Sequence, residues 1–534
     1  MEVPVNGTTL NTRAHVFQDI TGVYSTISIF AIGAILVSVA NTKWFALVTG
    51  IALPGISQVR GNLLLGLLPY SCYNGLACTL DLLYKASEKQ GLSYGWMGSK
   101  VLVLLRNEGM IKSILSQSDD IVSRTGGQRL MAPFSTLQRL LGNVLFLYVG
   151  EEATMMRNAM KAEYKHTSAL QAMYSEVVRT VQDHTQLLKR HQETGQNTED
   201  LLKLTSDFSA DVLSRTYFGL EGTHTRDDGL EHIADRMLEI SASASHAWRH
   251  GLHSILTLRS PRRQDEEEKT VWQALDAISE QRLRDMYGSE EPDTNMRAVA
   301  LSISRATGGG SSRAKLSKYA IEQGRLTLFG GRFGIGIVLT WALIELAKHP
   351  AILTKMRCEL NSLDSGDDFP DFQTLATQTP YLDAVLHEIH RLFPPVHATA
   401  RVINAPIVVE TNDGTPVELD KGMIVYISIY HLHHDKTIWG EDADEFVPER
   451  FLFTSYKRSG YMPFLYGRRA CVGREFSILV EKTFLVEFLR TWEFDVKDKS
   501  EIRPKFSALC LPDREVEIML REREVGNGNG DVEM

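Results

Sequence analysis

Uncharged residues are concentrated at the beginning of the chain, where the pattern differs from everything that follows. The segment 20–42 contains no charged residue and is rich in Ile, Val, Ala and Leu, and about 20 apolar residues are enough to span a bilayer. It follows a polar tail, 1–19, so we predict a retained transmembrane signal anchor and not a cleaved signal peptide. A second uncharged run contains the helix-breaking pair Pro54-Gly55, which predicts an interfacial hinge over 43–60.

Between about residues 80 and 350 the hydrophobic positions recur mainly at helical spacing. Apolar residues three and four apart predict helices over 102–115 and 207–218. A glycine- and serine-rich stretch, 308–312, precedes a long predicted helix over 315–348, and the sequence His349-Pro350 ends it.

After residue 400 the pattern changes to short runs of β-branched residues. The runs 402–410 and 424–429 are bounded by turn residues at 412–414 and 421–422, which predicts strands of a small sheet. The last residues, 525–534, are rich in glycine, asparagine and acidic residues and are predicted to form a disordered tail. We therefore expect a mainly α fold with small β-sheets, in which the strands cluster late.

The composition is that of an ordinary globular protein. Of 534 residues, 43% are apolar and 23% are charged, and no internal repeat is visible. One large domain over 61–524 is therefore favoured over the several domains that length alone suggests. The net charge of −9 argues against nucleic acid as a partner. The five cysteines are odd in number and scattered, which favours a reducing compartment over a disulfide framework.

One cysteine lies among residues with a distinct chemistry. Cys471 is surrounded by Phe464, Gly467, Arg469 and Gly473 in the spacing F-x-x-G-x-R-x-C-x-G. The two glycines allow tight turns and close approach of the backbone to a flat group. Arg469 is a permanent cation suited to a carboxylate, and Phe464 offers a flat apolar wall. These residue types are what a thiolate-ligated haem needs.

This run resembles the haem-binding signature of the cytochrome P-450 superfamily. The resemblance implies a single large haem domain behind the N-terminal transmembrane anchor, with haem b as the cofactor and Cys471 as the axial ligand of its iron. It also implies that Arg469 binds a haem propionate, while Phe464 and the loop glycines Gly467 and Gly473 pack against the proximal face. The resemblance extends over about residues 80–520, because further motifs follow in the order typical of the family.

Two of these motifs resemble family elements that stabilise the core beneath the haem. Glu388 and Arg391 lie three residues apart on one helical face, and Arg450 follows in the sequence Pro-Glu-Arg-Phe. A buried charge is tolerated only when it is paired and hydrogen-bonded. The resemblance therefore implies a charge-assisted triad of Glu388, Arg391 and Arg450 with a structural and not a catalytic role.

Two more arginines are placed near the haem propionates by the resemblance. Arg401 lies between the Glu388 helix and the first late strand, and Arg157 lies on a helix that begins near Gly150. In the family this helix carries a tryptophan four residues before the arginine, but the position holds Ala153 here, so one hydrogen-bond donor is missing. Family position also implies that the pocket walls are 330–336, 396–399 and 506–509.

The long helix departs from the family at the position of a proton relay. Relatives that activate oxygen carry an acid followed by a threonine, which organise proton delivery. Aligned on Trp341, these positions hold Phe333 and Gly334, and neither side chain donates a proton. Gly334 widens the groove for a water or a substrate hydroxyl, whereas Arg332 could only orient water, because a guanidinium is effectively never deprotonated.

Three functions remain open on this basis. The first, which we favour, is a monooxygenase that inserts one oxygen atom of O2 into a lipophilic small molecule and takes protons from water or from the substrate. The second is a haem-thiolate isomerase or dehydratase that needs no external oxygen. The third is a catalytically silent haem-binding protein.

Partners and location are further expectations. The chain leaves no room after the cysteine loop for a flavin or iron–sulfur domain, so a monooxygenase would need a separate NADPH-dependent flavoprotein reductase. Local positive charge would steer an acidic reductase to this side; the residues concerned are Lys457, Arg458, Arg468, Arg469 and Arg474.

A membrane anchor suits a lipophilic substrate. We expect a single-pass protein of the endoplasmic reticulum membrane whose haem domain faces the cytosol. Asn6 begins a glycosylation sequon that is usable only if the tail is lumenal. The long anchor resembles that of fungal members that tailor secondary metabolites such as terpenoids, polyketides or alkaloids, which is an analogy at the level of the fold.

Overall fold

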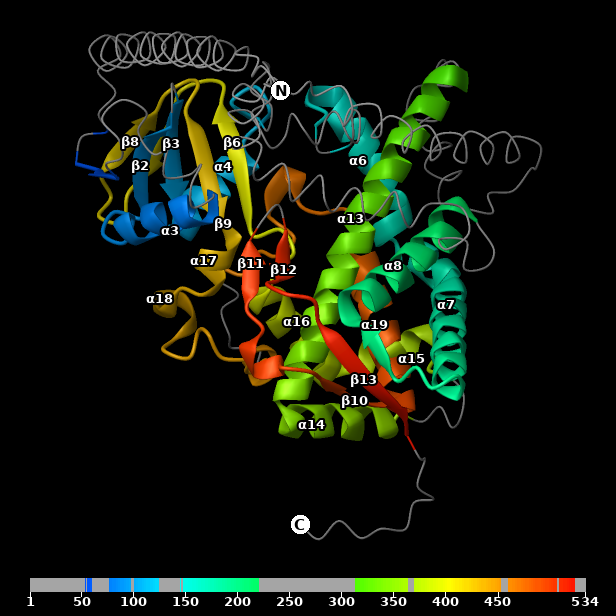
Figure 1. The fold of residues 1–534 in the computed structure, drawn as a ribbon. Helices are drawn as coiled ribbons and strands as arrows, with labels where there is room; N and C mark the ends of the chain where they lie inside the picture. Colours follow the sequence, from blue (N-terminus) through cyan, green and yellow to red (C-terminus); the bar gives the residue numbers. More distant parts are fainter. Residues whose placement is uncertain are drawn as a thin grey trace, which may run out of the picture.

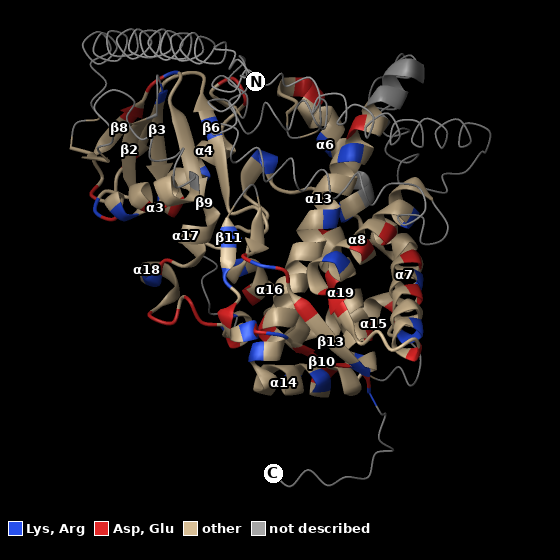
Figure 2. Ribbon diagram, in the orientation of Figure 1, with Lys and Arg blue, Asp and Glu red and all other residues tan. Residues whose placement is uncertain are grey.

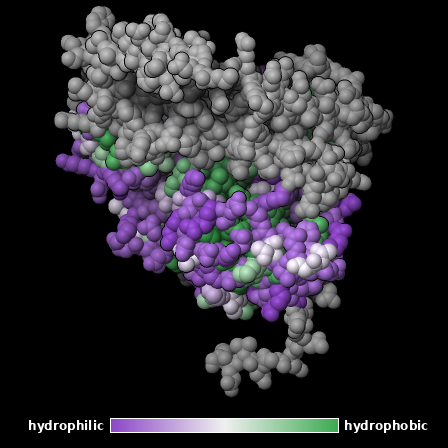
Figure 3. Space-filling model, in the orientation of Figure 1, coloured by the Kyte–Doolittle hydropathy of each residue, from purple (hydrophilic) through white to green (hydrophobic). Residues whose placement is uncertain are grey.

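A sheet-rich part and a helical part lie side by side in the computed structural model, and the long helix α13 (Arg313–Lys348) runs through the helical part (Figure 1). The structure describes residues 53, 55–59, 76–97, 100–123, 145, 147–219, 313–363, 369–452, 460–506 and 509–523. Charged residues lie mainly on outer surfaces, for example along α7 (Thr167–Glu193) and α14 (Pro350–Asn361) (Figure 2). On the face shown in Figure 3, the described residues are mostly hydrophilic, and hydrophobic residues show between them near the middle.

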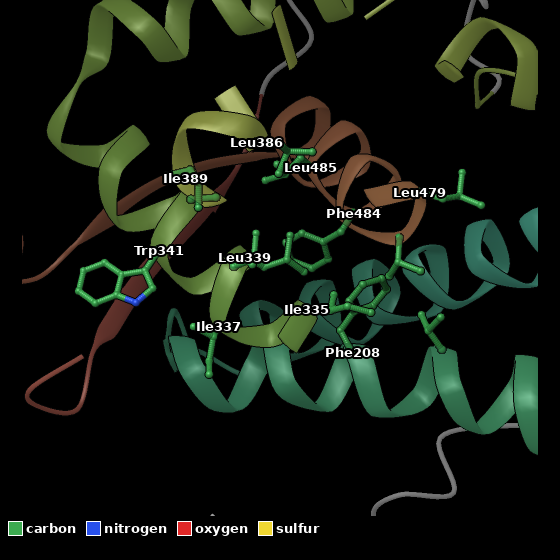
Figure 4. Close-up of a cluster of buried hydrophobic side chains, with 14 of the residues drawn as sticks. Phe208, Ile335, Ile337, Leu339, Trp341, Leu386, Ile389, Leu479, Phe484 and Leu485 are labelled. Atoms are coloured by element: carbon green, nitrogen blue, oxygen red, sulfur yellow. The ribbon is translucent and has the colours of Figure 1, made fainter. Parts of the chain in front are cut away.

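The helical part is organised around α13, whose second half is almost entirely buried. Besides α7 and α14, this part contains α6 (Gly150–Lys165), α8 (Leu201–Phe218), α16 (Pro380–Leu392), α19 (Arg474–Thr491) and the shorter α15 (Phe372–Thr377). Buried side chains of α13, α8, α16 and α19 meet in one apolar cluster, which includes Ile337, Leu339, Phe208, Ile389 and Phe484 (Figure 4). Since each large apolar side chain contributes about 1.5–3 kcal/mol when buried, this cluster determines where the middle of α13 stands relative to α16 and α19.

The largest sheet has six strands in the order β1-β2-β3-β9-β6-β4. Its strands are β1 (Ser57–Gln58), β2 (Leu92–Met97), β3 (Lys100–Leu105), β4 (Val122–Ser123), β6 (Ala398–Ile403) and β9 (Ile424–Ser428). Early and late parts of the chain meet at its centre, where β3 runs parallel to β9 and β6 runs antiparallel to β9. The helices α3 (Leu76–Ala86) and α4 (Glu108–Ser116) lie against this sheet.

Smaller sheets and short helices complete the fold. The small sheets pair β7 (Ile407–Glu410) with β8 (Pro416–Leu419), β11 (Pro504–Phe506) with β12 (Cys510–Pro512), and β13 (Glu517–Glu522) with β5 (Thr198–Asp200) and β10 (Trp492–Val496). The short helices are α17 (Ile429–His433), α18 (Lys436–Trp439), η1 (Pro448–Phe451), η2 (Gly467–Arg469) and η3 (Lys499–Glu501). The predicted mainly α fold with small sheets is confirmed within the described residues.

The helix predicted over 102–115 is wrong in its first half. Residues 101–105 are buried in β3 between β2 and β9, and the helix begins only at Glu108. A short run of apolar residues that is buried on both faces has no period that separates strand from helix. The local signal for the true start of the helix is Asn107, whose side chain accepts the Met110 N–H over 3.1 Å and caps α4. The expectation that the strands cluster late holds for eight of the thirteen described strands, β6 to β13, whereas β1 to β5 lie before residue 201.

Other predicted elements agree with the structure, except that one predicted strand is divided into two. The helices predicted over 207–218 and 315–348 lie within α8 and α13, and the run 424–429 corresponds to β9. The run 402–410 is not one strand, because residues 404–406 separate β6 from β7, and the two strands belong to different sheets.

The predictions for the two ends of the chain lie outside the described residues: the tail 1–19, Asn6, the anchor 20–42 and the tail 525–534. The strand β1 falls within the predicted hinge 43–60 and pairs with β2, so the sheet begins before the predicted domain boundary at residue 61. Among the described residues, the helical stretch Ile321–Lys348 is long and apolar enough to span a bilayer. Because 72% of its most apolar window is buried inside the protein, its burial is that of a core helix.

Candidate functional site

The predicted cysteine loop, 464–473, contains η2 and leads into α19, and Cys471 is exposed near its end. The Cys471 N–H donates to the Phe464 carbonyl oxygen over 2.8 Å, which closes the loop. Leu465 and Gly467 have φ values of +61° and +72°, and a Cβ on Gly467 would lie 2.5 Å from the carbonyl oxygen of Leu115 on α4. Glycine is therefore required at 467 both by its backbone conformation and by the close approach of α4.

Gly473 plays a different part from Gly467. It precedes α19 with a φ of −88°, which other residues adopt freely. A Cβ at this position would meet nothing within 4 Å. The backbone bends at 472–473, but this bend does not require glycine, and the effect of the missing side chain is to leave open space close to Cys471.

Three arginines from distant parts of the chain converge at this loop. Arg157 of α6 donates from Nη2 to the carbonyl oxygen of Ala470, the residue before the cysteine. Arg401 of β6 is buried, and burial together with the neighbouring Arg469 lowers its pKa to about 10. Burial and Arg469 also lower the pKa of Arg157, although the Cys471 side chain acts in the opposite direction. Arg469 thus acts on both of the other arginines, which places the guanidinium groups of Arg157 and Arg401 near that of Arg469.

The arginine cluster has donors that are left for a further anion. Within the described residues, Asp119 is the carboxylate that pairs with the cluster, through Arg469. Arg401 Nη2 and Arg469 Nη1 are buried and find no hydrogen-bond partner among the described residues. A buried charged donor without an acceptor is costly, and guanidinium groups bind carboxylates in a matched geometry. The residues present therefore fit a group that brings carboxylates, as a haem does with its propionates.

Asp119 is a functional candidate that sequence patterns do not mark. Its carboxylate accepts hydrogen bonds from Arg469 and from the Gly150 N–H at the start of α6, the latter over 2.8 Å. Its carbonyl oxygen accepts from Asn404 Nδ2 over 2.7 Å. Asp119 thus joins the cysteine loop, α6 and the end of β6, but a single aspartate in a loop has no motif that could have identified it.

The three charged residues of the predicted triad meet in a buried network. Arg391 donates from Nε and Nη2 to the two oxygens of Glu388, both over 2.7 Å, and Arg450 Nε donates to Glu388 over 3.3 Å. The remaining Arg391 donors bind backbone carbonyl oxygens, namely those of His433, Ala443 and Glu445. Such complete pairing is what allows these charges to be buried.

His433 connects this network to the cysteine loop. Its Nδ1 donates to the Arg391 carbonyl oxygen over 2.9 Å, and its Nε2 accepts the Met462 N–H over 3.0 Å. Burial lowers the pKa of His433 well below its usual range, which keeps the imidazole neutral and able to accept. Since Met462 lies two residues before Phe464, this hydrogen bond connects the network to the backbone just before the loop.

The middle of α13 contains two kinds of glycine. Gly331 and Gly336 face α8, where an added Cβ would lie 2.6 Å from a methyl carbon of Leu213 and 2.8 Å from a side-chain oxygen, respectively. Gly330 and Gly334 are one turn apart, and a Cβ on either would meet nothing within 4 Å. Two glycines therefore allow close helix packing, and the other two border open space.

The two proton-relay positions lie in this stretch. Phe333 is buried and packs edge-on against Phe329, with 5.5 Å between ring centroids, and Gly334 has no side chain to donate. Arg332 is turned toward α8, where its Nη2 donates to Asp207 over 3.1 Å and both side chains are buried. Arg332, which could at most orient water, is thus held by a carboxylate of the neighbouring helix.

Two of the predicted pocket walls lie together. The His397 and Phe506 rings have centroids 5.1 Å apart, and the Cys510 N–H donates to the Pro395 carbonyl oxygen over 3.0 Å. Val396 remains 46% exposed although it is apolar. Residues 507 and 508 of the second segment are outside the described residues.

Comparison with known proteins gives a consistent result. The profile of the family described as Cytochrome P450 matches residues 81–520. The chain is 27% identical to Secologanin synthase 2 of Catharanthus roseus over 331 residues, which are 60% of this chain and 61% of that protein. It is 32% identical to Cytochrome P450 monooxygenase claP of Ampulloclitocybe clavipes over 201 residues, or 35% of this chain and 37% of that protein.

A longer alignment is found with Cytochrome P450 CYP72A219 of Panax ginseng. It is 27% identical over 421 residues, which cover 75% of this chain and 76% of the relative. The family match thus includes the cysteine loop, the arginine cluster and the middle of α13, whereas the alignments to the first two relatives span less than two thirds of their lengths.

Proposed function

The chain belongs to the cytochrome P450 family, and from this premise we propose that it is a haem-thiolate monooxygenase acting on a lipophilic small molecule. Family membership implies a haem whose iron is bound by a cysteine thiolate. The haem, when bound, supplies the activation of O2. What this chain contributes is the ligand, the charges that hold the propionates, and the shape of the substrate side.

The observation that carries the proposal is the convergence of Arg157, Arg401 and Arg469 beside Cys471, with buried donors that lack acceptors. We assign Cys471 as the iron ligand and the three arginines to the propionates. Phe464, Gly467 and Gly473 would pack against the proximal face, and the space beside Gly473 supports this assignment. Glu388, Arg391 and Arg450 hold the loop from below and take no part in chemistry.

Proton supply is the least conventional part of this proposal. Phe333 and Gly334 donate nothing, and the space beside Gly334 has room for a water molecule or a polar group of the substrate. A hydroxyl held at Gly334 would deliver protons as a positioned general acid. The substrate is therefore proposed to be lipophilic with at least one polar group.

A second function is favoured by the same two residues. A haem-thiolate isomerase or dehydratase acts on a substrate that is already oxygenated and needs neither O2 nor proton relay. The absence of side-chain donors at Phe333 and Gly334 fits such an enzyme equally well. A silent haem-binding protein has no observation in its favour, because the open side of α13 borders space of the kind a substrate would need.

The monooxygenase proposal includes an electron donor and a membrane. An NADPH-dependent flavoprotein reductase would approach the cysteine loop, where Arg468 is exposed and Arg474 is partly exposed. The anchor at 20–42 would hold the protein in the endoplasmic reticulum membrane with the haem domain in the cytosol. The name of the relative Secologanin synthase 2 supports secondary metabolism as the setting.

The decisive experiment is turnover of a candidate lipophilic substrate by membranes containing the full chain, with ¹⁸O2, with and without the reductase. We expect a product that carries the label and forms only when the reductase and NADPH are present. An unlabelled product formed without the reductase would replace the monooxygenase by the isomerase or dehydratase. Membranes containing the Cys471→Ala variant serve as the control for other oxidases.

A further inference from the structure

A buried pair of titratable side chains lies behind the cysteine loop and is used by none of the roles above. His390 of α16 and Glu481 of α19 are 3% and 1% exposed, and His390 Nε2 lies 2.9 Å from Glu481 Oε2. The pair sits where α16 and α19 pack, next to the apolar cluster around Leu386 and Leu485. Burying a polar pair in such a place gives less stability than apolar side chains of similar size would give. The pair therefore calls for a role other than stabilising the fold.

The pair is connected to Cys471 by two contacts. The His390 ring packs against the Phe464 ring, with 4.8 Å between centroids. The Phe464 carbonyl oxygen accepts the Cys471 N–H over 2.8 Å. The buried His390 ring therefore packs against the residue whose carbonyl oxygen binds the backbone of the cysteine.

The hydrogen bonding of the pair is incomplete. Neither His390 Nδ1 nor Glu481 Oε1 has a partner among the described residues, although both atoms are buried. Burial raises the pKa of Glu481, and the neighbouring His390 only partly offsets this. A buried carboxylate that accepts one hydrogen bond favours the presence of a shared proton, because loss of that proton would leave a net negative charge in an apolar surrounding.

Several other charged and titratable groups on the elements around the pair are engaged elsewhere. Glu388 binds Arg391 and Arg450, Lys482 binds Asp383, and Glu449 binds Lys355. Glu359 accepts two backbone N–H groups, and His433 is fixed by two hydrogen bonds. The guanidinium of Arg474 lies 5.8 Å from the centroid of the Phe464 ring. Among these groups, the pair has the titratable ring that packs directly against Phe464.

We propose that His390 and Glu481 are positioning residues that hold Phe464 and the cysteine loop, and that the pair takes up or releases one proton in step with reduction of the bound haem. The inference rests on the proposed assignment of Cys471 as the iron ligand. Reduction adds one electron from the reductase and no atom, and the balancing proton comes from solvent. A deprotonated pair carries a net charge of −1 behind the loop, so it opposes the added electron, and the reduction equilibrium falls as the pH rises.

The test is an equilibrium reduction titration of the full haem-loaded protein, followed by absorbance between about pH 6.5 and 9. For the unmodified protein we expect the equilibrium constant for reduction to fall by up to about tenfold across this range, which is 59 mV for one electron. In Glu481→Gln the shape is kept but the acid that shares the proton is gone, so the constant should vary by less than about twofold. A flat profile for the unmodified protein, or an unchanged slope in Glu481→Gln, would overturn the proposal.

A matched control is available in a second buried pair. His184 and Asp211 join α7 to α8, with 2.7 Å between Nε2 and Oδ2, and both side chains are buried. Asp211→Asn is therefore expected to keep the pH dependence of the unmodified protein. If Asp211→Asn flattened the profile as Glu481→Gln does, the effect would be general and the assignment to His390 and Glu481 would be wrong.

Two further measurements separate the possible failures. Should Glu481→Gln not fold, the double variant His390→Leu with Glu481→Leu replaces the pair by apolar side chains, and it should give the same flat profile. An unmodified protein whose reduced carbon monoxide complex lacks a thiolate-type spectrum would contradict the assignment of Cys471, which is a failure of the proposed function. A thiolate-type spectrum together with a reduction equilibrium that does not depend on pH would contradict only the role proposed for His390 and Glu481.

Discussion

The cysteine-loop side and the α13 side of the site are built in opposite ways. On the loop side, α6 and α17 hold the backbone by hydrogen bonds, through Arg157 to the Ala470 carbonyl oxygen and through His433 to the Met462 N–H. The close approach of α4 restricts the backbone at Gly467. On the α13 side, the functional positions are marked by missing side chains, since Gly330 and Gly334 border open space. Polar contacts thus fix the backbone on the loop side, whereas the α13 side leaves space beside its glycines.

This difference corresponds to two different tasks. A ligand must be held in one geometry, so its support can be rigid and the same for any substrate. A substrate side must match one molecule, so its shape is adjusted by single residues such as Phe333 and Gly334. Substitutions on the loop side should therefore destroy the site or the fold, and those on the α13 side should change its shape at little cost in stability.

The largest expected effect comes from Cys471→Ala. Without the thiolate, the reduced carbon monoxide complex should lose its thiolate-type absorption band entirely, and turnover should fall to background. Absorbance spectra of the purified protein check this. Cys358→Ala removes an exposed cysteine on α14 and should leave the spectrum unchanged. A thiolate-type band that persisted in Cys471→Ala would mean that another cysteine is the ligand.

Arg391→Leu should have the next largest effect. It leaves Glu388 buried with Arg450 as its remaining partner and frees the carbonyl oxygens that Arg391 binds. Removing one member of such a network costs about 3–5 kcal/mol. We therefore expect a poor yield of protein and a decrease of this size in the free energy of unfolding measured in urea. Arg514→Leu, which breaks a pair on the exposed surface, should unfold like the unmodified protein. Equal losses in both variants would contradict a special role for the triad.

Arg401→Met should act in opposite directions with and without haem. The pKa of Arg401 in the folded protein, about 10, lies below its ordinary value, so near pH 7 its charge opposes folding while no anion is bound. We expect the haem-free protein to gain about 1–3 kcal/mol in unfolding free energy and the loaded protein to lose haem faster. Chemical unfolding of the haem-free protein and transfer of haem to a scavenger measure the two effects.

Arg469→Met provides the contrast, because Arg469 is already paired with Asp119. It should weaken haem retention without stabilising the haem-free protein. A haem-free Arg401→Met protein less stable than the unmodified one would show that the charge of Arg401 is balanced without a ligand.

The smallest effects are expected on α13 and should have opposite signs at two glycines. An alanine Cβ at Gly336 would lie 3.0 Å from the backbone of Ser206, and such overpacking costs about 1–3 kcal/mol. At Gly334 there is open space, so alanine should stabilise the helix by up to about 1 kcal/mol. Thermal unfolding of both variants checks the signs. A loss at Gly334 as large as that at Gly336 would mean that the space beside Gly334 is filled.

The cysteine loop and the long helix were predictable because their signals are local. Fixed spacings around Cys471 and apolar positions along 315–348 each occupy one stretch of sequence. The strand β3 was missed since its residues are buried on both faces and have no alternation. Asp119 and the His390–Glu481 pair were missed because each acts through partners far away in sequence.

The sequence by itself determined the residue types of the site and the order in which they occur: the cysteine, the arginines, the Glu388–Arg391 pair and the unusual Phe333-Gly334. The tertiary structure decided what these residues do to one another. Arg332 pairs with Asp207 of α8, the lack of a side chain at Gly473 leaves open space, and Arg157, Arg401 and Arg469 lie around the carboxylate of Asp119. The physical reason is that charge, burial and close approach depend on distances between segments, which spacing along a chain does not encode.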